Sequence, residues 1–136
     1  MASIQIRFLD GPIDVQQALA QWATAEERRG CGACTIFEGI VRPEEKGRPI
    51  SSLKYEIYQP MTGNVMRQLG ERVAANCGIV AAIICHSHGK VPVGKCSFWM
   101  GVAGKHRRET LLFTEQFIDE MKRQVPIWKV PRRPAE

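Results

Sequence analysis

The spacing of apolar residues along the chain predicts three helices. Apolar side chains at helical intervals favour a helix over residues 13–23, and Gly30 offers a stop after it. Between residues 60 and 78 the apolar positions recur every fourth residue, which is typical of a helix with one buried face. The pattern becomes helical again over residues 105–125, and Pro126 ends it.

Four further apolar or alternating segments favour β-strands. Residues 33–41 are rich in β-formers, residues 53–58 alternate apolar and polar positions, and residues 79–85 are almost wholly apolar. Residues 96–103 form the fourth segment, after a turn or strand edge at Val91–Gly94. Two strands, a helix, two further strands and a helix predict an α+β fold, with a mixed or antiparallel sheet and about three helices.

The chain has the length of one compact domain. Its 136 residues are 44% hydrophobic and 24% charged, which is ordinary for a globular protein, so a single domain over residues 1–136 is expected. Residues 130–136 are predicted to be a mobile tail unless a partner holds them. The sequence has no apolar run of membrane-spanning length and no secretory layout at its N-terminus, so we expect a cytoplasmic protein without membrane contact.

The five cysteines do not suggest a disulfide framework, because their number is odd and no secretory signal is seen. Cys31 and Cys34 have CxxC spacing, so a zinc or redox role has to be weighed. The next candidate ligands, Cys85, His86 and His88, lie far along the chain, and Cys34 falls in a strand-like segment. Reduced, mostly buried thiols are the simpler interpretation, and no metal is expected.

The charge balance favours an anionic partner. The net charge is +5 and the isoelectric point is near 9.1, which suits nucleic acid, a phosphorylated small molecule or an acidic protein. A basic module that binds RNA or DNA without catalysis is therefore one hypothesis. Against it, the aromatic residues are not interleaved with arginine and lysine as a stacking platform requires.

Basic residues fall at four places that suit a site. Arg42 follows a predicted strand directly and starts a loop. Lys105–Arg108 open the last predicted helix, where cations and unpaired N–H groups together suit a phosphate. Lys122 lies next to Met121, near the apolar stripe of that helix, and Lys129 follows a stiff apolar segment. Each group also has a simple interpretation as a solvated surface or a helix-dipole partner.

His106 and Lys122 are too far apart to act on one small substrate from within one chain. Positions 106 and 122 are 16 residues apart on one predicted helix, which corresponds to about 24 Å. If both belong to one site, a second copy of the chain has to supply one of them. A symmetric dimer supplies it twice.

A series of landmarks, none specific alone, gains specificity from its order and spacing over nearly the whole chain. They are Gly32-Ala33, Phe37–Arg42, Leu53–Tyr58 leading into Met61, His86, Gly89, Val93-Gly94, Val102, His106-Arg107 and Ile118-Asp119 through Lys122 to Val125–Lys129. In this order they resemble the large, catalytic subunit family of molybdopterin synthase. The resemblance implies an α/β-hammerhead fold within the α+β class.

The resemblance also implies an assembly and an activity. Two copies of this subunit would form a homodimer with a small ubiquitin-like subunit at each end, a heterotetramer overall. That partner would insert a C-terminal Gly-Gly thiocarboxylate into a pocket here, and two sulfurs would pass in succession to cyclic pyranopterin monophosphate. The product is the dithiolene of molybdopterin, so the implied enzyme is a sulfurtransferase of molybdenum cofactor biosynthesis. No cofactor or metal is implied in this site, because the sulfur arrives on the partner's tail.

The family's substrate-contacting positions fall on Ile40, Val41, Arg42, His106, Arg107, Lys122 and Lys129. Arg42 and Arg107 would hold the phosphate and the thiocarboxylate, and His106 would hydrogen-bond the substrate or move a proton. Lys122 is the predicted main catalytic group, because desolvation and neighbouring cations favour acid–base or covalent chemistry. Arg42 and Lys129 complete the catalytic set, with Lys129 as a neutraliser of charge. No cysteine has to be catalytic.

Three departures from the family pattern leave an inactive paralogue as a further hypothesis. Ser87 stands where relatives usually carry arginine, and Lys95 stands where they commonly carry glutamate. If those two positions normally pair, their joint replacement leaves no orphan charge. The sequence also stops at Glu136, whereas many relatives continue with a basic tail that helps to close the pocket. Arg132 or Arg133 could take over that role.

Overall fold

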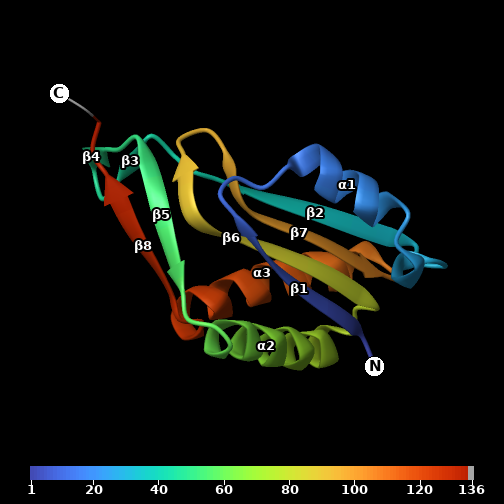
Figure 1. The fold of residues 1–136 in the computed structure, drawn as a ribbon. Coiled ribbons are helices and arrows are strands. Elements are labelled where there is room, and N and C mark those ends of the chain that lie inside the picture. Colours follow the sequence, from blue (N-terminus) through green and yellow to red (C-terminus); the bar gives the residue numbers. More distant parts are fainter. Residues whose placement is uncertain (135–136) are drawn as a thin grey trace.

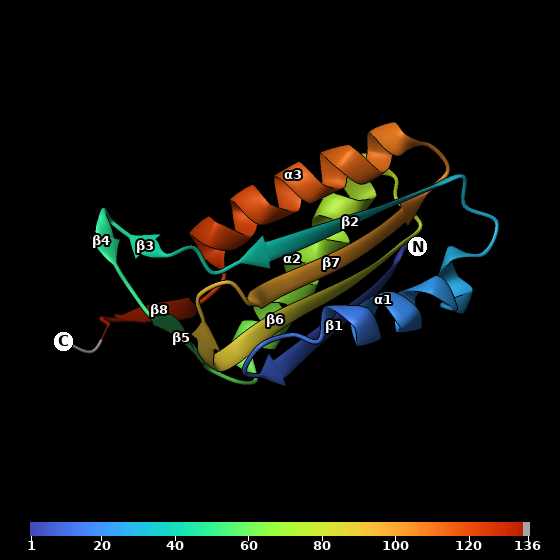
Figure 2. The same ribbon diagram turned by 90° about the horizontal axis from the view of Figure 1, so that it is seen from above.

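A computed structural model describes residues 1–134, and Figures 1 and 2 show a β-sheet with helices on both faces. The predicted α+β class with about three helices is confirmed. In chain order the elements are β1 (Ser3–Asp10), α1 (Val15–Ala23), the 3-10 helix η1 (Glu26–Arg28), β2 (Ala33–Ile40), β3 (Glu44–Glu45), β4 (Arg48–Pro49), β5 (Ser52–Ile57), α2 (Met61–Cys77), β6 (Ala81–Pro92), β7 (Cys96–Gly104), α3 (Arg107–Gln124) and β8 (Ile127–Arg132).

The main sheet is mixed and changes direction along β6. Its strands run in the order β2-β7-β6-β5-β8, and β1 also pairs with β6. The β1–β6 pair is parallel and the other pairs are antiparallel. β6 pairs with β7 up to His86 and with β1 up to His88, and from Gly89 onward it pairs with β5. Gly89 has a φ of +80°, which suits glycine, and the β5–β8 ribbon turns away from the rest of the sheet there (Figure 1).

Two apolar cores lie on opposite faces of the sheet. α2 and α3 cover one face, where Phe113 and Phe117 are fully buried against sheet residues such as Ile84. α1 covers the other face through Trp22, which is fully buried over Gly101. Because the two faces are both covered, every residue of β7 is buried.

α3 has a defined start and a defined end, and both bear on the functional positions. His106 is the N-cap residue, and its backbone N–H donates to the Glu109 carboxylate at 3.2 Å in a capping box. At the other end, Met121 and Val125 are buried in the core and anchor the last turn. The helix therefore spans the distance between the two predicted functional regions without a break.

The structure corrects the sequence analysis at both ends of the chain. β1 was not predicted, and β6 continues beyond the predicted residues 79–85. The predicted mobile tail is wrong for Val130–Arg132, because these residues pair with Ser52–Lys54 of β5. Residues 135 and 136 of that predicted tail lie outside the described part of the chain.

A cationic cavity at the bend of the sheet

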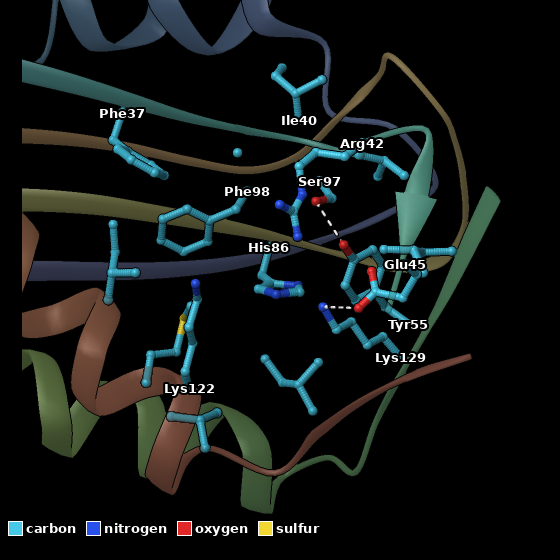
Figure 3. A pocket seen from close by; sticks show the side chains of 17 residues that line it. Phe37, Ile40, Arg42, Glu45, Tyr55, His86, Ser97, Phe98, Lys122 and Lys129 are labelled. Atoms are coloured by element: carbon cyan, nitrogen blue, oxygen red, sulfur yellow. Dashed lines mark hydrogen bonds and ion pairs between the residues drawn. The ribbon is translucent and has the colours of Figure 1, made fainter. Parts of the chain in front are cut away.

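A cavity of about 580 Å³ opens where the β5–β8 ribbon leaves the main sheet, beside the last turn of α3 (Figure 3). The predicted positions Ile40, Val41, Arg42, Lys122 and Lys129 all line it. The remaining lining residues are Phe37, Gly39, Glu45, Leu53, Tyr55, His86, Ser97, Phe98, Ile118, Met121, Val125 and Ile127. Five of the seven predicted substrate-contacting residues therefore come together in one chain.

Three separate elements bring the cations to this cavity. Arg42 directly follows Val41, which is buried. The Val41 N–H donates to the Lys95 carbonyl oxygen, and the Val41 carbonyl oxygen accepts from the Gly94 N–H. Lys122 projects from the last turn of α3. Lys129 lies on β8. Figure 3 shows the side chains of Arg42 and Lys122 pointing into the cavity. Each cation is thus held by a backbone that is fixed elsewhere.

Lys129 has a carboxylate partner inside the cavity. Its Nζ lies 3.0 Å from Oε1 of Glu45, and the Glu45 side chain is 14% exposed. Glu45 belongs to the short β3–β4 hairpin, which follows Arg42 in the chain. By contrast, no carboxylate of residues 1–134 is within ion-pair distance of Lys122. The two lysines therefore have different electrostatic surroundings.

The desolvation predicted for Lys122 is wrong for this chain by itself. The residue as a whole is exposed, although the neighbouring Met121 is buried. The physical reason is that the cavity is open, so water reaches the end of the lysine side chain. Desolvation of Lys122 would need a further group to cover the cavity.

Tyr55 and Ser97 form a polar contact on the wall of the cavity. The Tyr55 hydroxyl donates to Oγ of Ser97 at 3.0 Å, and Tyr55 lies opposite Lys129 in the β5–β8 register. Burial raises the pKa of the Tyr55 phenol, and this effect is partly offset by the Ser97 hydrogen bond and the nearby Lys129 cation. Tyr55 thus stays protonated and supplies a neutral hydroxyl beside the lysine.

His86 is a buried, neutral histidine on the floor of the cavity. Its Nδ1 lies 2.7 Å from the Ser87 carbonyl oxygen, which only accepts, so Nδ1 carries the proton. Burial lowers the pKa of His86, and the Ser87 hydrogen bond offsets this only in part. The ring also packs edge-on against Tyr55 and Phe98, with centroids 5.1 and 5.9 Å apart. Nε2 is therefore left as a hydrogen-bond acceptor.

His106 and Arg107 are not part of this cavity. They lie at the opposite end of α3 from Lys122 and are exposed, so one chain does not bring the two groups together. At the N-terminus of α3, predicted as an anion site, the Glu109 carboxylate already accepts from the backbone N–H of the N-cap residue His106. This placement agrees with the helix-length argument that His106 and Lys122 share a site only if a second copy contributes.

No role in substrate binding or catalysis was predicted from the sequence for Glu45, Tyr55, His86 and Ser97. Tyr55 and His86 were available as landmarks of the resemblance, and a histidine in an apolar segment deserves a test as a site residue. Glu45 and Ser97 had no such signal. Their partners lie 84 and 42 positions away in sequence, at Lys129 and Tyr55, so only the fold brings these pairs together.

The cysteines lie outside the cavity and are less buried than predicted. Cys85 and Cys96 are buried, but Cys31 and Cys77 are partly exposed and Cys34 is exposed, so mostly buried thiols is a wrong description. Cys34 is exposed because it lies on the edge strand β2. Within residues 1–134 no cluster of three or more histidine, cysteine or acidic side chains has metal-binding geometry. Of the helices in this part of the chain, none has both the length and the apolar character that a membrane crossing demands.

The cavity has the chemistry of an anion-binding site. Arg42, Lys122 and Lys129 provide three cations against the single carboxylate of Glu45, and an arginine fork and lysine ammonium groups are suited to phosphate and carboxylate oxygens. The Tyr55–Ser97 hydroxyl pair and Nε2 of His86 add neutral hydrogen-bonding groups. Fold and cavity together define an α+β protein whose mixed sheet opens onto a cationic site for small anionic groups.

Comparison with known proteins agrees with this class. The family model described as MoaE protein matches residues 9–124. The chain belongs to this family. It is 37% identical to the molybdopterin synthase catalytic subunit of Pyrococcus abyssi over 95% of this chain and 86% of that protein. The human protein of the same name is 34% identical over 73% of this chain.

The chain is shorter than several of its relatives, whereas it matches solved bacterial structures over most of their length. It covers 53% of the human protein and 32% of a relative from Drosophila willistoni. A molybdopterin synthase structure from Staphylococcus aureus has a TM-score of 0.78 at 28% identity and covers all of this chain. A complex of subunits 1 and 2 of molybdopterin-converting factor from Helicobacter pylori also has a TM-score of 0.78, over 93% of this chain.

Proposed function

We propose that this chain is the catalytic subunit of a molybdopterin synthase. In this role it transfers sulfur from the thiocarboxylated C-terminus of a small ubiquitin-like subunit to cyclic pyranopterin monophosphate and so forms the dithiolene of molybdopterin. The observation that carries the proposal is the convergence of Arg42, Lys122 and Lys129 in one cavity. These are the positions that the family resemblance marks as catalytic, and three different elements supply them.

The cavity suits both anionic reactants. The phosphate of the pterin and the thiocarboxylate of the carrier each need cationic or N–H donors, and Arg42 provides a planar fork beside two ammonium groups. The Helicobacter pylori relative was solved as a complex of its two subunits, which supports a small-subunit partner for this chain. A bound partner tail would also cover Lys122 and remove water from it, which the open cavity of the single chain does not do.

The cavity residues divide the chemical work. Lys122, which faces the cavity without a carboxylate partner among residues 1–134, is the group that exchanges protons or forms a covalent bond with the substrate. Arg42 and Lys129 neutralise charge on the reacting anions. In this proposal the chemistry calls for no metal or other cofactor in the site, and the protein acts in the cytoplasm.

A second copy of the chain completes the site in this proposal. His106 and Arg107 lie at the far end of α3, so they reach a substrate beside Lys122 only from a neighbouring copy. Apolar side chains are exposed along edge strand β2 and on the first turns of α3, and such a surface favours association. They are Ile36, Phe37, Ile40, Leu111 and Leu112.

The test is a reconstitution of the reaction. The protein is mixed with a thiocarboxylated small subunit and cyclic pyranopterin monophosphate, and the dithiolene product is measured. We expect product from the wild-type chain, at least about 100-fold less from Lys122→Ala, and near wild-type levels from Lys54→Ala. Lys54 is an exposed lysine of β5 outside the cavity and serves as the control.

Each outcome of this assay has a separate meaning. Absence of product from the wild-type chain with active small subunit would contradict the proposed function and favour an inactive paralogue. Full activity of Lys122→Ala would instead remove Lys122 from the mechanism and leave the function in place. A nucleic-acid module is less favoured, because most aromatic rings, such as Trp22 and Trp99, are buried or partly buried, and Trp128 and Tyr58 are the only exposed tryptophan, tyrosine or phenylalanine residues outside the cavity lining in the described part of the chain.

A further inference from the structure

The ion pair between Glu45 and Lys129 is the feature of the cavity that the proposed mechanism leaves unused. The Nζ–Oε1 distance is 3.0 Å, and the Glu45 side chain is far less exposed than that of Lys129, at 14% against 52%. A surface pair of this kind contributes little to stability. Its position inside the cavity gives it a different significance, because Lys129 is one of only three cations that line the cavity within the described residues.

Lys129 is held from two sides. Tyr55 lies directly opposite it in the β5–β8 register, so the aromatic ring flanks the lysine stem. Glu45 then fixes the ammonium end. A free lysine side chain samples many rotamers, and it loses conformational freedom when it is ordered. Glu45 and Tyr55 order Lys129 before any substrate arrives.

We propose that Glu45 is a positioning residue for sulfur transfer, which holds the Lys129 ammonium at a fixed place in the cavity. This inference rests on the proposed function. Glu45 itself does not need to touch the substrate. Its carboxylate also opposes the entry of anions, so Glu45 lowers the affinity for substrate while it raises the rate of the step that uses Lys129.

The opposite signs of these two effects make the proposal testable. In Glu45→Gln the side chain keeps its shape and loses its charge. A Gly-Gly-tailed small subunit with an ordinary C-terminal carboxylate should then bind roughly fivefold more tightly, because one repulsive charge near the tail is gone. The single-turnover rate with the thiocarboxylated form should fall about tenfold, because Lys129 is no longer oriented. A merely structural role would weaken both.

Tyr55 provides a spectroscopic readout that does not depend on activity. Its charged and titratable neighbours are Lys129, Glu45, Cys96 and the packed ring of His86, and among them the Glu45 carboxylate raises the pKa of Tyr55 while Lys129 lowers it. In ¹³C-tyrosine-labelled protein, Glu45→Gln should therefore move the Tyr55 titration to lower pH, and Lys129→Gln should move it to higher pH. The other tyrosine, Tyr58, is exposed and serves as the internal reference.

Glu44→Gln is the matched control for every measurement. Glu44 precedes Glu45 on the same two-residue strand, carries the same charge and is exposed outside the cavity. We expect near wild-type values for it throughout. The proposal is overturned if Glu45→Gln retains the wild-type rate, or if its affinity and rate fall together. If the wild-type chain makes no dithiolene, the proposed function fails, and the positioning of Lys129 is decided separately: if Glu45 holds Lys129, the shift of the Tyr55 titration caused by Lys129→Gln is smaller in the Glu45→Gln background than in wild type, and an equal shift in both backgrounds overturns the proposal.

Discussion

At the scale of single residues, the cavity depends on a histidine that stays uncharged. His86 is 5% exposed, donates through Nδ1 to the Ser87 carbonyl and is packed between two aromatic rings. A fourth positive charge, beside Arg42, Lys122 and Lys129, would raise the repulsion within the cavity. A neutral ring instead provides an acceptor among donors, which suits an N–H group of a pterin or of a carrier backbone.

This neutrality predicts how stability depends on pH. Burial lowers the pKa of His86 below its ordinary value of 6.5. Under mildly acid conditions His86 is therefore protonated in the unfolded chain and still neutral in the folded chain. The free energy of unfolding should therefore be insensitive to His86 above pH 6.5 and fall as the pH drops below it, by up to about 1.4 kcal/mol per pH unit. Melting temperatures between pH 7.5 and 5 measure this.

The comparison that isolates His86 uses two variants. His86→Phe should lose less stability than wild type over the acid range, whereas His88→Gln should follow the wild-type slope. His88 lies two positions along the same strand, is partly exposed and lies outside the cavity. Equal slopes for wild type and His86→Phe would show that the ring is charged in the folded state.

The residue scale also shows what the sequence could reveal about the site. Arg42, Lys122 and Lys129 were identified because each sits at a recognisable place: after a strand, on a helix face, and after a proline-containing apolar segment. Glu45 and Ser97 were not, because a glutamate in a polar loop and a serine in an apolar strand have no local pattern that distinguishes them. Their roles arise from contacts between elements that are distant in sequence.

At the scale of elements, the largest contact between α1 and the sheet is made by one side chain, Trp22. A Cβ at Gly101 of β7 would lie 2.8 Å from two ring atoms of Trp22, so only glycine lets the indole approach this closely. Trp22 is also the single buried residue of α1. Val15 and Ala18 of α1 add smaller contacts with the same core, so Trp22 above Gly101 is the largest contact that docks the helix.

A double-mutant cycle tests this attachment. Gly101→Ala alone should cost about 1–3 kcal/mol in the free energy of unfolding, because the added methyl group collides with Trp22. Trp22→Ala alone should cost about 3–5 kcal/mol. In the Trp22→Ala background, Gly101→Ala should cost nothing further, since the collision partner is gone. Urea denaturation gives all four values, and a cost that is equal in both backgrounds would contradict the contact.

The elements that were predicted and those that were missed differ in a physical way. Amphipathic helices and the strands at 33–41, 53–58, 79–85 and 96–103 were found because periodicity is a local property. β1 has an alternating pattern too, but its parallel pairing with β6 has no local signature. The second half of β8, residues 130–132, was interpreted as a tail, and Pro131 followed by arginine is typical of a loop. A proline is compatible with β8 because this strand lies at the edge of the sheet.

At the scale of the whole molecule, the length of α3 decides how many chains make one site. The helix runs from Arg107 to Gln124 without a break, with His106 at its cap and Lys122 in its last turn. No bending of such a helix brings its two ends to one small substrate. If both ends act on the same molecule, each site of the assembly contains residues of two copies.

Complementation between two inactive variants tests this arrangement. His106→Ala and Lys122→Ala should each form assemblies with little sulfur transfer. In a dimer that contains one chain of each kind, one of the two sites regains both residues, so a statistical mixture should recover about a quarter of the wild-type activity. The two chains are unfolded together, refolded and assayed against each variant treated alone. No recovery would show that His106 and Lys122 do not act together across two copies, and full activity of His106→Ala alone would show that His106 does not serve the reaction.

The bend of β6 at Gly89 has a mechanical consequence. Lys122 belongs to a helix packed on the main sheet, whereas Lys129 and Tyr55 belong to the ribbon that β6 joins to that sheet beyond the bend. The separation of the two ammonium groups is therefore set by the angle of a joint rather than by either part alone. A partner protein that presses on the β5–β8 ribbon from outside would change the angle at Gly89, and with it the separation of the Lys122 and Lys129 ammonium groups.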